Sequence, residues 1–90
     1  MIEFKENKVL YKTTDNKVIG EVEFISVRKN IIDIIHTYVA PEYRNQSIAS
    51  KLLTELTDYY TNQGIKIIYS CSYAKRWSEK NKENESVDKN

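Results

Sequence analysis

One short stretch of the chain joins a strand, a turn and the start of a helix around residues that could bind an anion. Residues 39–50 read VAPEYRNQSIAS and place Arg44, Asn45 and Ser47 directly before a helical pattern. The start of a helix offers unpaired backbone N–H groups and the positive end of the helix dipole, so such a unit suits a phosphate. The alternative is that the turn only redirects the chain and that Ser47 or Asn45 caps the helix.

The elements on both sides of this turn predict a β-α-β unit. Upstream, residues 31–39 (IIDIIHTYV) form the most apolar strand, which favours a central place in a sheet. Downstream, apolar residues recur at helical spacing from Ser47 to about Gln63, and Gly64 is a natural end for this helix. The strand predicted at 65–70 (IKIIYS) then returns beside residues 31–39 and parallel to them.

The rest of the chain predicts an antiparallel meander before this unit and a short helix after it. Polar turns separate strands in which apolar and polar residues alternate, with apolar positions at Ile2, Phe4, Val9, Tyr11, Val18, Val22 and Phe24. After Cys71, one face of an amphipathic helix carries Tyr73, Ala74 and Trp77. The expected fold is α/β (α+β), with a mixed sheet in a single domain over 1–82 and a polar, disordered tail over 83–90.

Composition excludes several classes of protein. Ninety residues make one domain, expected as a monomer or weak homodimer. Fourteen Lys and Arg against thirteen Asp and Glu give a net charge of +1, which provides no general attraction for nucleic acid or an anionic membrane. A single cysteine, Cys71, cannot form an internal disulfide or a Cys-based metal cluster, so no metal is expected. Without an apolar leader or membrane span, the sequence predicts a cytoplasmic protein.

The same turn carries a resemblance to a known family. VAPEYRNQSIASKLL is similar to the coenzyme-A-binding motif of the GNAT superfamily of acetyl-CoA-dependent N-acetyltransferases, written Arg/Gln-x-x-Gly-x-Gly/Ala. Arg44 matches its first position and Ala49 its last, whereas Ser47 stands where the first glycine belongs. The flanking segments resemble the minimal single-domain members of that superfamily at His36, Thr37, Val39, Gly64, Cys71, Tyr73 and Trp77.

The resemblance implies that acetyl-CoA is the cosubstrate and lies along the edge of residues 35–40. Its pyrophosphate would be held by backbone N–H groups from about 44 to 49. The two parallel strands would splay apart between TYV and YSC, leaving a backbone donor for the oxyanion of the reacting thioester. The implied cofactor-binding residues are Tyr38, Val39, Arg44, Asn45, Gln46, Ser47, Ile48, Ala49 and Ser50.

Two positions of the turn depart from the family pattern. Relatives have Arg-Gly-Gln-Gly, whereas this chain has Asn45 and Ser47 in place of both glycines. A glycine is required only where φ is positive or where a Cβ would strike the phosphate. Asn tolerates a positive φ better than most residues, and Ser can cap a helix or add its hydroxyl to an anion site.

The resemblance also implies a catalytic pair, Cys71 and His36, near the thioester. In one route Cys71 accepts the acetyl group as a thioester while His36 takes the thiol proton. In the other, the acceptor amine attacks acetyl-CoA directly and Cys71 lines the site. Taken without the resemblance, Cys71 reads as a small buried hydrophobic residue, and His36 as a strand histidine hydrogen-bonded within the sheet.

Two functions follow from this resemblance. The first is an N-acetyltransferase that transfers acetyl to an unknown amine acceptor, for which an exposed protein or peptide amine would suit an open site. The alternative is a catalytically weak CoA-binding or protein-interaction module of the same fold. A nucleic-acid-binding protein would need a basic surface, which scattered lysines and a near-zero net charge do not provide.

Overall fold

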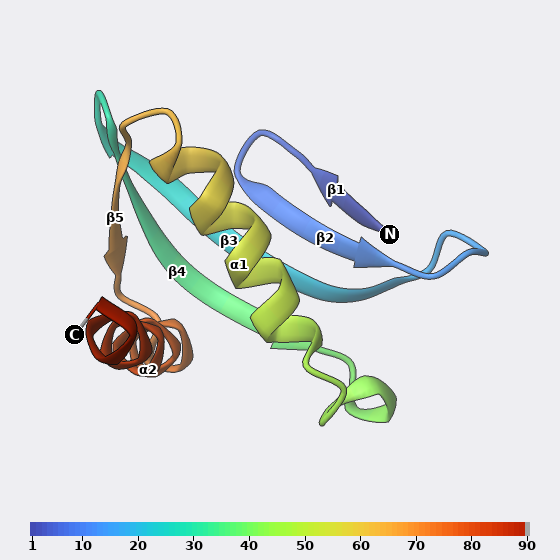
Figure 1. Cartoon of the computed structure of the whole chain (residues 1–90). Helices are drawn as coiled ribbons and strands as arrows, with labels where there is room; N and C mark the ends of the chain where they lie inside the picture. Colours follow the sequence, from blue (N-terminus) through green and yellow to red (C-terminus); the bar gives the residue numbers. More distant parts are fainter. Residues whose placement is uncertain (90) are drawn as a thin grey trace.

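The computed structural model describes the backbone of residues 1–89 and the side chains of residues 1–81. Five strands form one sheet in the order β1-β2-β3-β4-β5, antiparallel except for the parallel pair β4–β5. The predicted meander and β-α-β unit are therefore confirmed (Figure 1). In chain order the elements are β1 (Ile2–Phe4), β2 (Lys8–Lys12), β3 (Val18–Arg28), β4 (Ile31–Val39), the 3-10 turn η1 (Pro41–Tyr43), α1 (Ile48–Thr61), β5 (Lys66–Tyr69) and α2 (Ser72–Lys89).

Helix α1 lies across one face of the sheet and closes the core (Figure 1). Its apolar stripe is buried against β2, β3 and β4, and Leu52, Leu53 and Leu56 are fully buried. Gly20 on β3 permits this close approach, since a Cβ there would lie 2.9 Å from the side chain of Ile48. The first turn of α1 is therefore fixed on the sheet by packing, beside the end of β4.

A β-bulge in β4 changes which residues face α1. Phe24 pairs with Ile34 and Glu23 with His36, so Ile35 has no partner on β3. Before the bulge, the side chain of Ile34 faces the core. Because side chains alternate along a strand, the extra residue brings Thr37 to the α1 side and turns His36 to the opposite face.

Helix α2 differs in length from the prediction. It runs from Ser72 to Lys89, so the expectation of a short helix was wrong. Ala74 is fully buried and Trp77 packs against the core, as their predicted helix face requires. The predicted tail over 83–90 begins where side chains lie outside the described residues, and its disorder stays a prediction. Over the described part of the chain, no helix is long and apolar enough to cross a membrane.

Candidate active site at the β4–α1 corner

The corner between β4 and α1 is built by a proline turn followed by two left-handed residues. Pro41 starts the 3-10 turn, and the Tyr43 N–H donates to the Ala40 carbonyl at 2.9 Å. Asn45 then has φ 68° and Ser47 φ 61°. These are the two positions where the family pattern has glycine, so the corner keeps a glycine-like backbone without glycine.

The N-terminus of α1 is open because no side chain caps it. Ser47 occupies the cap position in the left-handed conformation and its hydroxyl makes no cap hydrogen bond, so the alternative in which its side chain caps the helix is not seen. The first helical bond joins the Lys51 N–H to the Ser47 carbonyl at 3.0 Å. The N–H groups of Ile48, Ala49 and Ser50 therefore have no helical partner and remain available to an anion.

The splay between the two parallel strands is present where the sequence predicts it. Pairing of β4 with β5 ends at Ile34 and Tyr69, and the Ile34 carbonyl accepts the N–H groups of both Ser70 and Cys71 at 3.0 Å. The Asp33 carboxylate holds this branch point by accepting the hydroxyl of Ser70 at 2.8 Å and its backbone N–H at 3.1 Å. Beyond it, β4 continues to Val39 with β3 paired on one side, while β5 has left its other edge.

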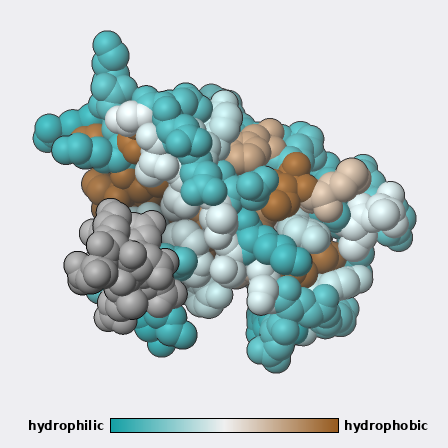
Figure 2. Space-filling view, in the orientation of Figure 1, coloured by the Kyte–Doolittle hydropathy of each residue, from teal (hydrophilic) through white to brown (hydrophobic). Residues whose placement is uncertain are grey.

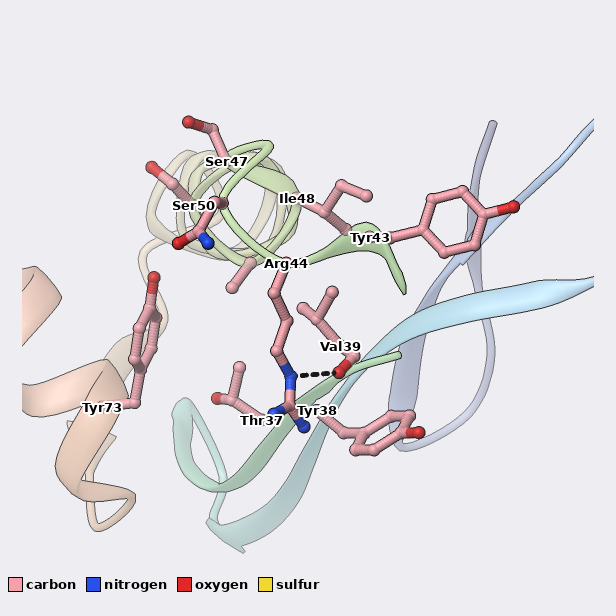
Figure 3. Close-up of a pocket in the computed structure, with 11 residues that line it drawn as sticks. Thr37, Tyr38, Val39, Tyr43, Arg44, Ser47, Ile48, Ser50 and Tyr73 are labelled. Carbon is pink, nitrogen blue, oxygen red and sulfur yellow. Dashed lines mark hydrogen bonds between the residues drawn. The ribbon is translucent and has the colours of Figure 1, made fainter. Parts of the chain in front are cut away.

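The backbone direction on this edge follows from one hydrogen bond. The Ala40 N–H donates to Ile19 on β3 at 2.8 Å. Because polar backbone groups alternate in direction along a strand, those of Thr37 and Val39 point the other way, into the splay. A hydrogen bond from Arg44 agrees with this direction, since its Nε donates to the Val39 carbonyl at 3.0 Å (Figure 3).

A pocket of about 620 Å³ joins this strand edge to the open helix start. Figure 2 shows the surface indented at its lower edge, between the α2 side and the lobe of the proline turn. Arg44 is the charged residue among those lining the pocket, so its charge favours an anion. The lining residues are Thr37, Tyr38, Val39, Tyr43, Arg44, Asn45, Ser47, Ile48, Ala49, Ser50 and Tyr73.

Most of the predicted cofactor-binding residues meet at this pocket. Gln46 is the predicted residue that does not line it. Thr37, Tyr43 and Tyr73 line it but were not predicted to bind the cofactor, although Thr37 and Tyr73 belong to the pattern that identified the family resemblance. Tyr73 extends from α2 with its hydroxyl directed toward the start of α1 (Figure 3). That orientation depends on how α2 packs, which local spacing does not encode.

Cys71 lies beside the pocket at the start of α2. Its Sγ donates to the Thr37 hydroxyl at 3.5 Å, and its carbonyl accepts the Lys75 N–H at 2.9 Å. Burial raises the pKa of the thiol. The Thr37 hydroxyl, which can turn to donate to the thiolate form, and the backbone N–H groups of Ala74, Tyr73 and Thr37 outweigh burial and hold the pKa below its ordinary value. A thiolate is thus favoured by the N-terminus of α2 and by the strand edge together.

His36 is not brought to Cys71. It is exposed and its cross-strand partner is Glu23 of β3. Its neighbour Thr37 faces the cysteine, so the imidazole projects from the other face of the sheet. The predicted pairing of His36 with the thiol is therefore not seen, and the partner of Cys71 is Thr37.

Comparison with known proteins places this arrangement in a family. The model of GCN5-related N-acetyltransferases matches residues 9–87, which is most of the chain. The chain belongs to the GCN5-related N-acetyltransferase family. The match spans β4 and β5, the turn between β4 and α1, α1 itself and most of α2.

Solved structures agree with this membership. The solution structure of a GCN5-like protein from Staphylococcus aureus, proposed to be an N-acetyltransferase, is 34% identical, with a TM-score of 0.74 over 90% of this family member and 79% of that chain. The fold is shared with a ribosomal-protein-alanine N-acetyltransferase from Brucella melitensis, at 18% identity and a TM-score of 0.66 over 81% of this chain and 59% of that one.

A third structure was determined with coenzyme A bound. The PaiA N-acetyltransferase of Thermoplasma acidophilum is 26% identical, with a TM-score of 0.56 over 64% of this chain and 35% of that chain. This chain therefore spans about a third of the length of that relative and just under three fifths of the Brucella enzyme.

Proposed function

We propose that this chain binds acetyl-CoA at the β4–α1 corner and transfers the acetyl group to an amine. One observation carries the proposal: the open N-terminus of α1 and the unpaired edge of β4 border the same pocket. The helix start suits a pyrophosphate. The strand edge suits the amides of the pantetheine arm, which can pair with it as an added strand would.

Backbone groups do most of the binding in this proposal. Residues of the turn and first helical turn, Asn45 to Ser50, surround the pyrophosphate, with Gln46 contributing only its backbone. Arg44 leaves the Val39 carbonyl when the ligand arrives and turns its charge to the phosphates, because the pantetheine amide takes the same carbonyl as acceptor. Tyr38 and Val39 supply the strand edge.

The splay also supplies a donor for the thioester carbonyl. The Thr37 N–H is already directed at the Cys71 sulfur. The Val39 N–H points into the splay as well and is placed to donate to the carbonyl oxygen. A fixed backbone donor of this kind stabilises the negative charge that develops on that oxygen when a nucleophile attacks.

Two routes of transfer remain, and the lowered pKa of the thiol supports the covalent one. In that route the Cys71 thiolate attacks the thioester carbonyl, a new C–S bond forms, and the bond to CoA breaks so that CoA leaves as its thiolate. The neutral acceptor amine then attacks the carbonyl of the acetyl-cysteine and a C–N bond forms. The C–S bond to Cys71 breaks, which restores the thiolate, and the proton lost by the amine passes to solvent. The thiol proton passes to solvent rather than to His36, which projects from the other face.

The covalent route is tested by incubation with acetyl-CoA followed by intact-protein mass spectrometry. We expect an added acetyl group on the wild type that is lost in Cys71→Ala. Lys75→Ala, which keeps the thiol and changes a nearby exposed side chain, should retain the adduct. A wild type that turns over an amine without any adduct would assign transfer to the direct route.

The second candidate is a CoA-binding module with little turnover. The position of His36 favours it, because the imidazole projects from the face opposite Cys71 and does not lie beside the thiol as a base. Turnover against a panel of protein, peptide and small-molecule amines divides the two candidates. Release of free CoA above the hydrolysis rate with any of these amines supports the enzyme, and CoA binding without such release supports the module.

A further inference from the structure

Ser50 and Trp77 form a hydrogen bond that links α2 to the open start of α1. The indole Nε1–H of Trp77 donates to the Ser50 hydroxyl at 3.0 Å, in a partly buried contact between residues 27 positions apart. Ser50 belongs to the first turn of α1 and lines the pocket. Trp77 was expected to pack at the core, and it does so, but its polar edge has this second role.

The direction of this bond decides what the Ser50 hydroxyl can do. An indole N–H is a donor only, so the Ser50 oxygen is the acceptor and its own proton must point elsewhere. Serine in a helix commonly donates to a carbonyl one turn earlier, as Thr57 and Thr61 do here. Among the described residues, no hydrogen bond has the Ser50 hydroxyl as donor. The proton is therefore free to point into the pocket.

We propose that Trp77 is a positioning residue that holds the Ser50 hydroxyl as a donor toward a phosphate of the bound coenzyme. The inference rests on the proposed function, because it names an additional donor of the same site. The indole orients the hydroxyl before the ligand arrives, so the donor adds to the N–H groups of the helix start without a search among rotamers. Through this bond, α2 takes part in anion binding without touching the anion.

The test compares a ligand that carries phosphates with one that carries none. Affinities of CoA and of pantetheine are measured from amide chemical shifts for the wild type, Ser50→Ala, Trp77→Phe and the double variant. Loss of a hydrogen bond to a charged group predicts about ten-fold weaker CoA binding in Ser50→Ala. Trp77→Phe keeps an aromatic ring but not the N–H donor and should weaken CoA binding about three-fold. The double variant should match Ser50→Ala, and pantetheine affinity should change in none of them.

The chain has a single tryptophan, so one indole N–H resonance reports the bond directly. CoA should shift this resonance in the wild type and leave it unmoved in Ser50→Ala, a readout that does not depend on the folding of Trp77→Phe. Ser50→Thr keeps a hydroxyl and should retain the shift.

Three results would overturn the inference alone: an unmoved indole resonance in a CoA-binding wild type, equal losses for CoA and pantetheine in Trp77→Phe, or losses that add in the double variant. A wild type that binds no CoA would instead reject the proposed function, and the inference with it.

Discussion

The two helices begin in opposite ways. The start of α1 follows Ser47, which has a left-handed backbone and no side-chain cap, so its N–H groups face the pocket unpaired. The start of α2 follows Cys71, whose sulfur receives the N–H groups of Tyr73 and Ala74. One helix start is left open, and the other is occupied by a thiol.

The difference between the two helix starts suits them to different tasks in the proposed function, the first to binding an anion and the second to activating a thiol. An uncapped helix start costs stability unless a ligand or water satisfies its N–H groups, so an open start at a pocket wall favours the binding of an anion. A helix start that faces a thiol stabilises its thiolate and makes a nucleophile of it. In the proposed function, the same partial charge of the backbone serves two chemical roles, anion binding at the start of α1 and thiol activation at the start of α2, on either side of the strand edge at Thr37.

The largest effect should come from placing a charge at the open helix start. Ser47→Asp puts a carboxylate beside the pyrophosphate, and repulsion between like charges at this range predicts a loss of CoA affinity of at least about ten-fold. Ser47→Asn is the matched control, because it is similar in size, tolerates a positive φ and carries no charge. Equal CoA affinities for the two variants, measured by titration, would show that no anion approaches this helix start.

A smaller effect concerns the left-handed backbone at the same residue. Ser47→Gly removes the strain of a positive φ, and we expect unfolding free energy to rise by about 0.5–1 kcal/mol in urea denaturation. Ser47→Ala keeps the Cβ and should match the wild type, because the hydroxyl makes no cap bond. A loss of about 1 kcal/mol in Ser47→Ala would instead mean that the hydroxyl does cap α1.

The other helix start is tested through the acidity of its thiol. Thr37→Val removes a hydroxyl that lowers the pKa of Cys71, so the pKa should rise and alkylation by iodoacetamide near neutral pH should slow about three-fold. Thr37→Ser keeps the hydroxyl and should behave as the wild type.

The pH profile of alkylation measures this shift directly. Because folding lowers the pKa, the thiolate contributes stability above the pKa of the unfolded thiol, and this contribution is lost as the pH falls through the folded value. An alkylation midpoint at or above that of free cysteine in the wild type would contradict this description of the α2 start.

The smallest effect is expected at Asn45, the other left-handed residue. Asparagine adopts this conformation more readily than serine, so Asn45→Gly should stabilise the fold by only a few tenths of a kcal/mol. Urea denaturation with an unchanged m-value checks this. A gain as large as that of Ser47→Gly would mean that residue type does not explain the strain at the corner.

Periodicity was enough to predict the sheet order and α1. Alternating residues identified the meander, and the leucines at helical spacing identified α1, because both patterns follow directly from which faces are buried. The length of α2 was not predictable in this way, since its polar second half shows no apolar stripe. The spacing of apolar residues indicates which face of an element is buried. A polar extension of a helix adds no apolar residues, so this spacing does not indicate it.

The site was predicted in part. The motif indicated the turn residues that line the pocket, because it marks the backbone shape of the turn. The predicted pairing of His36 with Cys71 is not seen, because the bulge at Ile35 inverts the order of faces along β4. The bond between Trp77 and Ser50 joins two helices, so no spacing along the chain could indicate it.

The measurement that tests the central claim most directly is a titration of isotope-labelled protein with CoA and acetyl-CoA. We expect saturable amide shifts concentrated at residues 36–52 and 69–73, where the strand edge, the open start of α1 and Cys71 meet. No shifts at millimolar ligand, or shifts confined to the strands far from this corner, would contradict the claim that the corner is a coenzyme A site.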